Sequence, residues 1–233
     1  MDCEHCFQGV RHEGTPTGAF EDIAGVKCYV ATPPGAHDAT KAVLFLCDAF
    51  GLTLTNNLLL CDDFARNGFK VYAPDEFEGE DVPIASFDSP EERAKLDREG
   101  WLARHSPAHN LARFKGVLDA LRRQGVTRFG ATGYCYGGRL VFDLVFAGEI
   151  HKYARTAAAP LLINACSDDR QYPREKQDAA RVLFDGFAPG FRQAYFAGCT
   201  HGFAVRGDMS DPKVREGKEG AFKNTVEWFE VHL

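Results

Sequence analysis

Short apolar runs alternate with amphipathic stretches along most of the chain. The apolar runs predict β-strands over residues 26–30, 42–47, 69–73, 127–132, 161–166 and 191–196. The amphipathic stretches predict helices over 57–67, 91–99, 108–123, 139–146 and 174–185, and a last one from Pro212. Continuous apolar runs such as Ala42–Cys47 are typical of parallel strands covered on both faces. The pattern therefore predicts one α/β domain over residues 1–233, with a mostly parallel sheet and helices on both faces.

Helical spacing also predicts which side chains the helices bury. In the stretch 174–185 it points to Ala179, Val182 and Leu183 as the buried face. Asp211 stands just before the last helix, where its side chain is expected to cap the first turn.

The segment between Gly148 and Asp169 is too short to hold two neighbouring parallel strands and the connection between them. Only about 20 residues separate the helix end near Gly148 from Asp169. A strand at Thr156–Ala159 would run directly into the one that starts after Pro160, whereas neighbouring parallel strands need a crossover of roughly a dozen residues. We expect either that the natural chain has a further loop between about Ala159 and Pro160, or that a deletion removes one strand.

Composition and charge narrow the class of protein. The 233 residues are 45% hydrophobic and 26% charged, as in soluble globular proteins, and the formal net charge of −6 argues against a nucleic-acid surface. No apolar run approaches the roughly 20 residues that span a bilayer, and the N-terminus does not resemble a signal peptide. Eight cysteines without a secretory signal suggest reduced thiols. We expect a cytoplasmic protein that binds neither nucleic acid nor membrane.

Cys3 and Cys6 have the C-x-x-C spacing of metal or redox pairs. No second cysteine or histidine pair follows at zinc-site spacing, so we expect no metal and no other cofactor. Most of the other cysteines lie in or beside apolar patterns and are expected to be small core residues: Cys28, Cys47, Cys61, Cys166 and Cys199.

The sequence GYCYGG at Gly133–Gly138 places a cysteine where hydrolases place a nucleophile. A strand precedes this turn and a helix follows it, which is the context of a nucleophile elbow. Such a turn holds its central residue, here Cys135, in strained backbone geometry, and the helix N-terminus favours a thiolate. The simpler interpretation is a buried cysteine in a tight turn.

A cysteine nucleophile needs a base, and the base needs an orienting group. His201 follows the last predicted strand in a glycine-flanked loop, where α/β-hydrolases place their histidine. Asp168 and Asp169 both follow the strand that begins at Leu161, where the acid is expected. The residues alone leave open which of the two is the acid, and His201 could also be a solvated loop residue.

Carbonyl attack also needs backbone N–H donors for the oxyanion. One is expected at Tyr136, after the nucleophile, and the other at Ala49, in the loop after the strand 42–47. Asp48 would then lie near the thiol, where a carboxylate could take the thiol proton or keep the thiol neutral. A turn-forming aspartate is the alternative interpretation.

These residues resemble the dienelactone hydrolase family, and most closely its fungal branch. The similar pieces are Cys6–Gly9, His12–Gly18, Asp48–Gly51, Ala73–Asp75, Gly133–Gly138 and His201–Phe203. The resemblance spans nearly the whole chain and implies an α/β-hydrolase fold with a Cys-His-Asp triad.

Carried over residue by residue, the family triad falls on Cys135, Asp169 and His201. Asp169 is preferred because the family acid precedes a proline by four positions, which fits Pro173. The oxyanion-loop acid falls on Asp48.

The resemblance implies hydrolysis of a small ester or lactone through an acyl-cysteine. Two features depart from the family. Arginines that bind the lactone carboxylate are expected after Asp75, but the stretch from Glu76 to Asp81 is acidic and Arg206 is the remaining candidate. The connection before Asp169 is also short. Alternatives on the same fold are a non-catalytic stress or interaction protein and a thiol redox sensor that uses Cys135.

Overall fold

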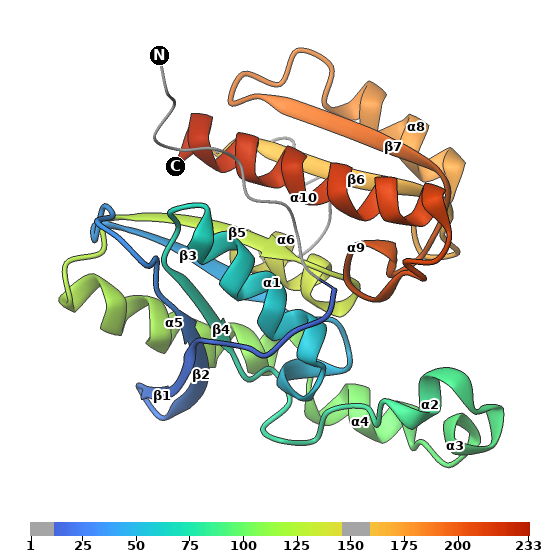
Figure 1. Ribbon diagram of the computed structural model, residues 1–233, viewed down its shortest axis with the longest axis horizontal. Coiled ribbons are helices and arrows are strands. Elements are labelled where there is room, and N and C mark those ends of the chain that lie inside the picture. The colour runs from blue at the N-terminus through green and yellow to red at the C-terminus, as the bar shows by residue number, and fades with distance from the viewer. Residues whose placement is uncertain (1–11, 146–158) are drawn as a thin grey trace. The chain divides into compact units, whose positions relative to one another are not determined.

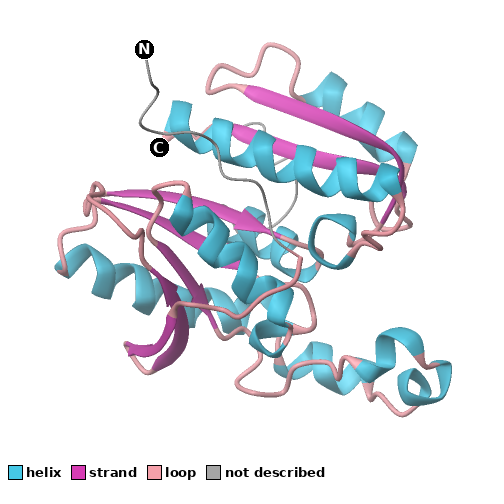
Figure 2. Cartoon of the chain, in the orientation of Figure 1, coloured by secondary structure: helices cyan, strands magenta, loops and turns pink. Residues whose placement is uncertain are grey.

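Strands and helices alternate along the chain as the hydrophobic pattern predicts (Figures 1 and 2). The computed structural model describes residues 12–145 and 159–233. The chain divides into two units, a first of residues 13–141 and a second of residues 1–12 and 142–233, and each is described by itself. The single domain expected from the sequence stays a prediction.

The first unit contains a five-stranded sheet in the order β1-β2-β4-β3-β5. Its strands are β1 (Ala19–Ile23), β2 (Val26–Ala31), β3 (Lys41–Leu46), β4 (Val71–Pro74) and β5 (Arg128–Gly133). β2 pairs antiparallel with β1 and β4, while β3 runs parallel to both β4 and β5. The hydrophobic pattern did not predict β1, since four of its five residues are exposed.

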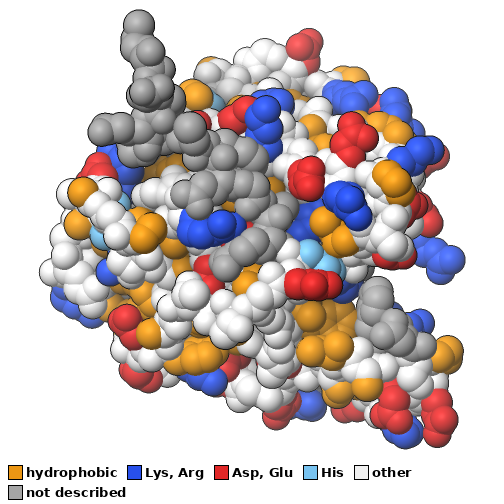
Figure 3. Space-filling view, viewed as in Figure 1, with side chains coloured by type: hydrophobic (Ala, Val, Ile, Leu, Met, Phe, Trp, Pro, Cys, Tyr) orange, Lys and Arg blue, Asp and Glu red, His pale blue; other side chains and the backbone are white. Residues whose placement is uncertain are grey.

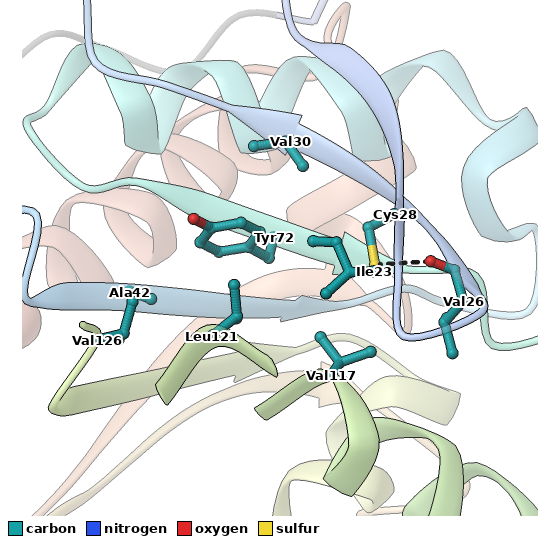
Figure 4. Packing of buried hydrophobic residues seen from close by; sticks show 9 residues of the cluster. All are labelled: Ile23, Val26, Cys28, Val30, Ala42, Tyr72, Val117, Leu121 and Val126. Carbon is teal, nitrogen blue, oxygen red and sulfur yellow. Dashed lines mark hydrogen bonds between the residues drawn. The ribbon is translucent and has the colours of Figure 1, made fainter. Parts of the chain in front are cut away.

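Two helices of the first unit, α1 (Thr55–Arg66) and α5 (Pro107–Arg123), cover opposite faces of this sheet (Figure 1). The unit also contains the 3-10 turn η1 (Gly51–Thr53), α2 (Ala85–Asp88), α3 (Pro90–Ala94), α4 (Arg98–Arg104) and the start of α6 (Tyr136–Val145). Ala42 of β3 packs in a cluster with Val117 and Leu121 of α5 (Figure 4). Phe45, which points to the opposite face of β3, contacts Phe64 of α1. The continuous apolar run of β3 is thus explained by burial on both faces.

The single helix predicted over residues 91–99 is wrong. The Ser89 side chain accepts the Glu92 N–H and begins α3, which ends at Ala94. Asp97 then accepts the Gly100 N–H and begins α4 as a separate helix. Two capping side chains therefore divide the stretch.

The second unit contains two parallel strands, β6 (Leu161–Asp168) and β7 (Phe191–Thr200), with helices on both faces. The helices are α8 (Arg174–Leu183), α9 (Phe203–Arg206) and α10 (Pro212–His232). Leu161 packs against Ala180 and Phe184 on the α8 side. On the α10 side, Asn164 Nδ2 donates to the Ala221 carbonyl at 3.2 Å.

Two expectations about these helices have different outcomes. The cap of α10 is confirmed, because the Asp211 side chain accepts the Lys213 N–H at 2.8 Å. The predicted buried face of α8 is wrong for Ala179, which is exposed, and for Val182, which is 79% exposed. Gln177 and Ala180 are the buried residues instead. Leu183 is half-buried and packs against the cluster of Leu161, Ala180 and Phe184, as predicted.

The connection before β6 is the one that the sequence leaves too short for a crossover. The possible strand at Thr156–Ala159 lies mostly outside the described residues, as do Cys3 and Cys6. Within the part of the chain that the structure describes, β6 pairs with β7 and with no other strand. The expectation of a further loop or a deletion stays untested.

The core prediction for the cysteines is confirmed: Cys28, Cys47, Cys61, Cys166 and Cys199 are all buried, and Cys28 lies in the cluster of Figure 4.

The surface carries both signs of charge. On the face drawn in Figure 3, Lys and Arg side chains are interspersed with Asp and Glu.

Candidate active site

Cys135 lies at the turn between β5 and α6, as the elbow pattern predicts. Its φ of 53° is in the left-handed region, which non-glycine residues rarely adopt. Cys135 is a free, half-buried thiol. A non-glycine residue in this region persists only where the surrounding structure holds it, and such residues cluster at functional sites.

Gly137 allows the elbow to approach the end of β3, and Gly133 allows the strand and the helix of the elbow to approach each other. A Cβ on Gly137 would lie 2.2 Å from the Leu46 carbonyl oxygen, and a Cβ on Gly133 would lie 2.3 Å from the Gly137 oxygen. Because no real Cβ atom comes this close to backbone, only glycine fits at these two positions.

Backbone hydrogen bonds then join the elbow to the loop after β3. The Tyr134 N–H donates to the Leu46 backbone carbonyl at 3.1 Å, and the Gly137 N–H donates to the Cys47 backbone carbonyl at 2.9 Å. The loop that carries Ala49 therefore starts directly beside the turn that carries Cys135 and Tyr136. Both predicted oxyanion donors belong to this hydrogen-bonded pair of turns.

Asp48 is completely buried in the loop after β3. Its Oδ1 accepts the Phe50 N–H at 3.2 Å and a hydrogen bond from Asn57 Nδ2 at 3.1 Å. These contacts fit the turn-forming interpretation of Asp48. A role in proton transfer with the thiol stays a prediction.

Glu76 also lies against this loop, a position that no pattern in the sequence predicts. It is fully buried, and its Oε1 accepts the Cys47 N–H at 2.6 Å. Burial raises the pKa of the Glu76 carboxyl well above its usual range, and the Asp75 carboxylate adds to the effect. An acidic stretch usually lies in solvent, so only the fold could place this residue inside.

In the second unit, His201 follows β7 directly and contacts Asp169. His201 Nδ1 lies 2.8 Å from Asp169 Oδ2, and both side chains are mostly buried. Asp169 Oδ1 accepts the backbone N–H groups of Gln171 and Tyr172, which fixes the orientation of the carboxylate. A carboxylate on Nδ1 favours the tautomer whose Nε2 can accept a proton.

Asp168 has a different place. It is the last residue of β6, and its backbone carbonyl accepts the His201 N–H at 2.9 Å. The chain therefore brings the Asp169 side chain to the imidazole, while Asp168 contributes its backbone.

Arg206 lies at the end of α9 and packs over the glycine that follows His201. A Cβ on Gly202 would lie 2.6 Å from Arg206 Cζ, and the Gly202 φ of 90° also favours glycine. The guanidinium is thus seated beside the histidine loop.

Two further histidines, His105 and His109, flank the start of α5, and the sequence predicts a surface position for both. His109 is exposed, with Nε2 2.7 Å from Glu78 Oε2. The expectation is wrong for His105, whose side chain is only 3% exposed and whose Nε2 lies 3.2 Å from Glu80 Oε2.

Cys135 belongs to the first unit and the His201–Asp169 pair to the second, so the triad as a whole stays a prediction. No three His, Cys, Asp or Glu side chains gather as a metal site would require among residues 12–145 and 159–233. None of the helices described there is long and apolar enough to cross a membrane.

Comparison with known proteins gives consistent matches over almost the whole chain. The model of the dienelactone hydrolase family matches residues 26–233. The chain is 31% identical to the hydrolase pyvD of Aspergillus violaceofuscus, over 98% of this chain and 96% of that protein. It is also 31% identical to dienlactone hydrolase 2 of Gibberella moniliformis, over 98% and 94% of the two chains.

Solved structures agree at the level of the fold. A Klebsiella pneumoniae protein superposes with a TM-score of 0.70 at 18% identity, covering 92% of this chain and 98% of the other. The dienelactone hydrolase of Anabaena variabilis superposes with a TM-score of 0.59 at 14% identity, covering 93% and 97%. The α/β-hydrolase fold that the resemblance implied is confirmed.

Proposed function

The chain belongs to the dienelactone hydrolase family and is an ester or lactone hydrolase, and we propose that it acts through an acyl-cysteine intermediate formed on Cys135. The observation that carries this proposal is the left-handed backbone of Cys135 at a strand-to-helix turn. The contact between His201 and Asp169 adds the oriented base that a thiol nucleophile needs.

In the proposed reaction the Cys135 thiol gives its proton to His201, and the sulfur attacks the carbonyl carbon. The Tyr136 and Ala49 N–H groups bind the oxyanion that forms. When the tetrahedral intermediate collapses, the C–O bond of the ester breaks and the leaving oxygen takes the proton from His201. For a lactone this oxygen stays attached to the acyl group.

Hydrolysis of the thioester then regenerates the enzyme. His201 removes a proton from water, and the resulting hydroxide attacks the acyl carbon. The C–S bond breaks, the acid leaves, and the proton returns to the thiolate. Asp169 keeps the imidazole in the productive tautomer and stabilises its charged form throughout.

The proposed substrate contacts use the remaining predicted residues. Arg206, seated over Gly202 beside His201, offers a guanidinium to a carboxylate or another oxygen of the substrate. Asp48 holds the oxyanion loop through its contacts with Phe50 and Asn57. The substrate is a small molecule, and catalysis by these residues requires no cofactor.

A panel of small esters and lactones tests the proposal with wild type, Cys135→Ala and Cys135→Ser. Cys135→Ala is expected to lower kcat by at least about 10³-fold, because no other residue supplies the attacking atom. Cys135→Ser is expected to be poor as well, since a hydroxyl ionises far less readily than a thiol. Cys28→Ala, a buried thiol on β2 of the same unit, is the control and should retain turnover.

Full turnover by Cys135→Ala would remove the acyl-cysteine mechanism. Alkylation of Cys135 in a wild-type enzyme that turns over no ester of the panel would favour a thiol redox protein instead.

A further inference from the structure

The side chain of Tyr136 is bound by two groups that lie outside the elbow. Its hydroxyl donates to the carbonyl of His105, at the end of α4. The same hydroxyl accepts a hydrogen bond from Asn110 Nδ2 at 3.1 Å. Asn110 lies in the first turn of α5 and is fully buried. The residue after the predicted nucleophile is thus fixed from a helical segment 26–31 positions earlier in the chain.

The orientation of Asn110 is itself determined. Arg113 Nη1 donates to Asn110 Oδ1 at 3.2 Å. Because a guanidinium can only donate, the amide oxygen must face Arg113 and the amide nitrogen must face Tyr136. Arg113 is mostly buried, and its Nε lies 3.8 Å from Glu78 Oε1. A polar chain therefore runs from Glu78 through Arg113 and Asn110 to the Tyr136 hydroxyl.

Aromatic packing fixes the ring of Tyr136 as well. The Phe77 ring centroid lies 5.2 Å away in an edge-on arrangement, and the Trp101 centroid lies 5.8 Å away. Phe77 is fully buried and packs against Trp101 at 4.7 Å. The ring therefore has little freedom to turn, and the hydroxyl contacts can transmit a constraint to the backbone.

That constraint acts at the strained point of the elbow. The left-handed conformation of Cys135 needs support from its surroundings. Backbone bonds of Tyr134 and Gly137 hold the turn on either side. The Tyr136 side chain adds a third attachment, directly after the strained residue.

We propose that Asn110 is a positioning residue of the hydrolase, which acts through the Tyr136 hydroxyl to fix the direction of the Tyr136 N–H. The inference rests on the proposed function, in which this N–H binds the oxyanion. Asn110 touches no reacting atom. Its contribution is to hold the donor in the geometry that the transition state requires.

A double-mutant cycle of Tyr136→Phe and Asn110→Ala tests this proposal. Tyr136→Phe keeps the ring and the backbone N–H and removes the hydroxyl alone. Each variant is expected to lower kcat about 10-fold and to change KM by less than about twofold, because the oxyanion forms only in the transition state. The double variant should lose no more than Tyr136→Phe alone, because that variant already lacks the Asn110 hydrogen bond as well as the one to the His105 carbonyl.

Tyr29→Phe is the matched control. It removes a buried phenol hydroxyl on β2 of the same unit, which donates to Asp62 Oδ1 at 2.8 Å. This variant should lose thermal stability as Tyr136→Phe does, but keep its kcat. A merely structural role of Asn110 would make the two phenylalanine variants alike.

Three results would overturn the inference. The first is an unchanged kcat in Asn110→Ala. The second is a change of KM alone in that variant, and the third is a double variant whose kcat is about 100-fold below that of the wild type. Failure of the proposed function is distinguished by Cys135→Ala: turnover by that variant removes the acyl-cysteine mechanism, whereas its inactivity together with a normal Asn110→Ala removes only the positioning role.

Discussion

Replacing Glu76 by glutamine should make the protein more stable than the wild type, by a margin that grows as the pH rises. Glu76 is fully buried, Oε1 accepts the Cys47 N–H, and Oε2 is buried with no hydrogen-bond partner in the described part of the chain. Burial raises the pKa of this carboxyl well above its ordinary value of 4.5. Glutamine preserves the acceptor for Cys47 and cannot ionise.

The size of the effect follows from proton linkage. Above pH 4.5 the unfolded chain has lost the Glu76 proton, while the folded chain keeps it because its pKa is raised. The free energy of unfolding then falls with rising pH, by about 1.4 kcal/mol per pH unit while the folded carboxyl stays protonated. From pH 5 upwards the wild type should therefore lose stability relative to Glu76→Gln, by at most about 1.4 kcal/mol per pH unit.

Urea unfolding of both proteins at pH 5, 6 and 7 measures this difference. Other titrating groups are common to the two proteins, so the difference between them isolates Glu76. Glu91→Gln is the control, because 85% of the Glu91 side chain is exposed and the same change there removes no buried carboxyl. Parallel stabilities for wild type and Glu76→Gln from pH 5 to 7 would refute the reasoning.

Three further predictions concern single residues. Asp169→Asn should lower kcat by up to about 10⁴-fold, and more than Asp168→Asn, because its side chain contacts His201; steady-state kinetics of the two variants decide the order. Gly137→Ala should lower the thermal unfolding midpoint far more than Gly138→Ala, since the added Cβ would lie 2.2 Å from backbone in the first case and 3.4 Å in the second. Asp211→Ala should cost about 1 kcal/mol in urea unfolding through loss of the α10 cap, and an unchanged midpoint would contradict that assignment.

Much of this protein could be read from local pattern. The apolar run of β3 predicts a strand buried on both faces, and Phe45 and Ala42 contact helices on opposite sides. The glycines around Cys135 predict a tight strand-to-helix turn, since no other residue allows backbone to approach so closely. These features depend on neighbours in the sequence, and the sequence therefore contains them.

Features that depend on polar side chains buried by distant segments could not be predicted. The face of α8 was assigned wrongly at Ala179 and Val182 because its buried side includes Gln177, whose amide donates to the carbonyls of Cys166 and Tyr172. A hydrophobic pattern cannot recognise a polar residue whose hydrogen bonds make burial possible.

The contacts around the candidate site were decided in the same way. Position after the strand leaves Asp168 and Asp169 open, and only the family resemblance favours Asp169, whereas the fold brings the Asp169 carboxylate to His201. Glu76 and Asn110 look like surface residues until the fold brings Cys47 and Tyr136 to them. The sequence by itself determined most of the strands and helices and the turn that carries the cysteine. Tertiary structure decided which polar groups meet, because a polar group is buried only where a partner from elsewhere in the chain satisfies it.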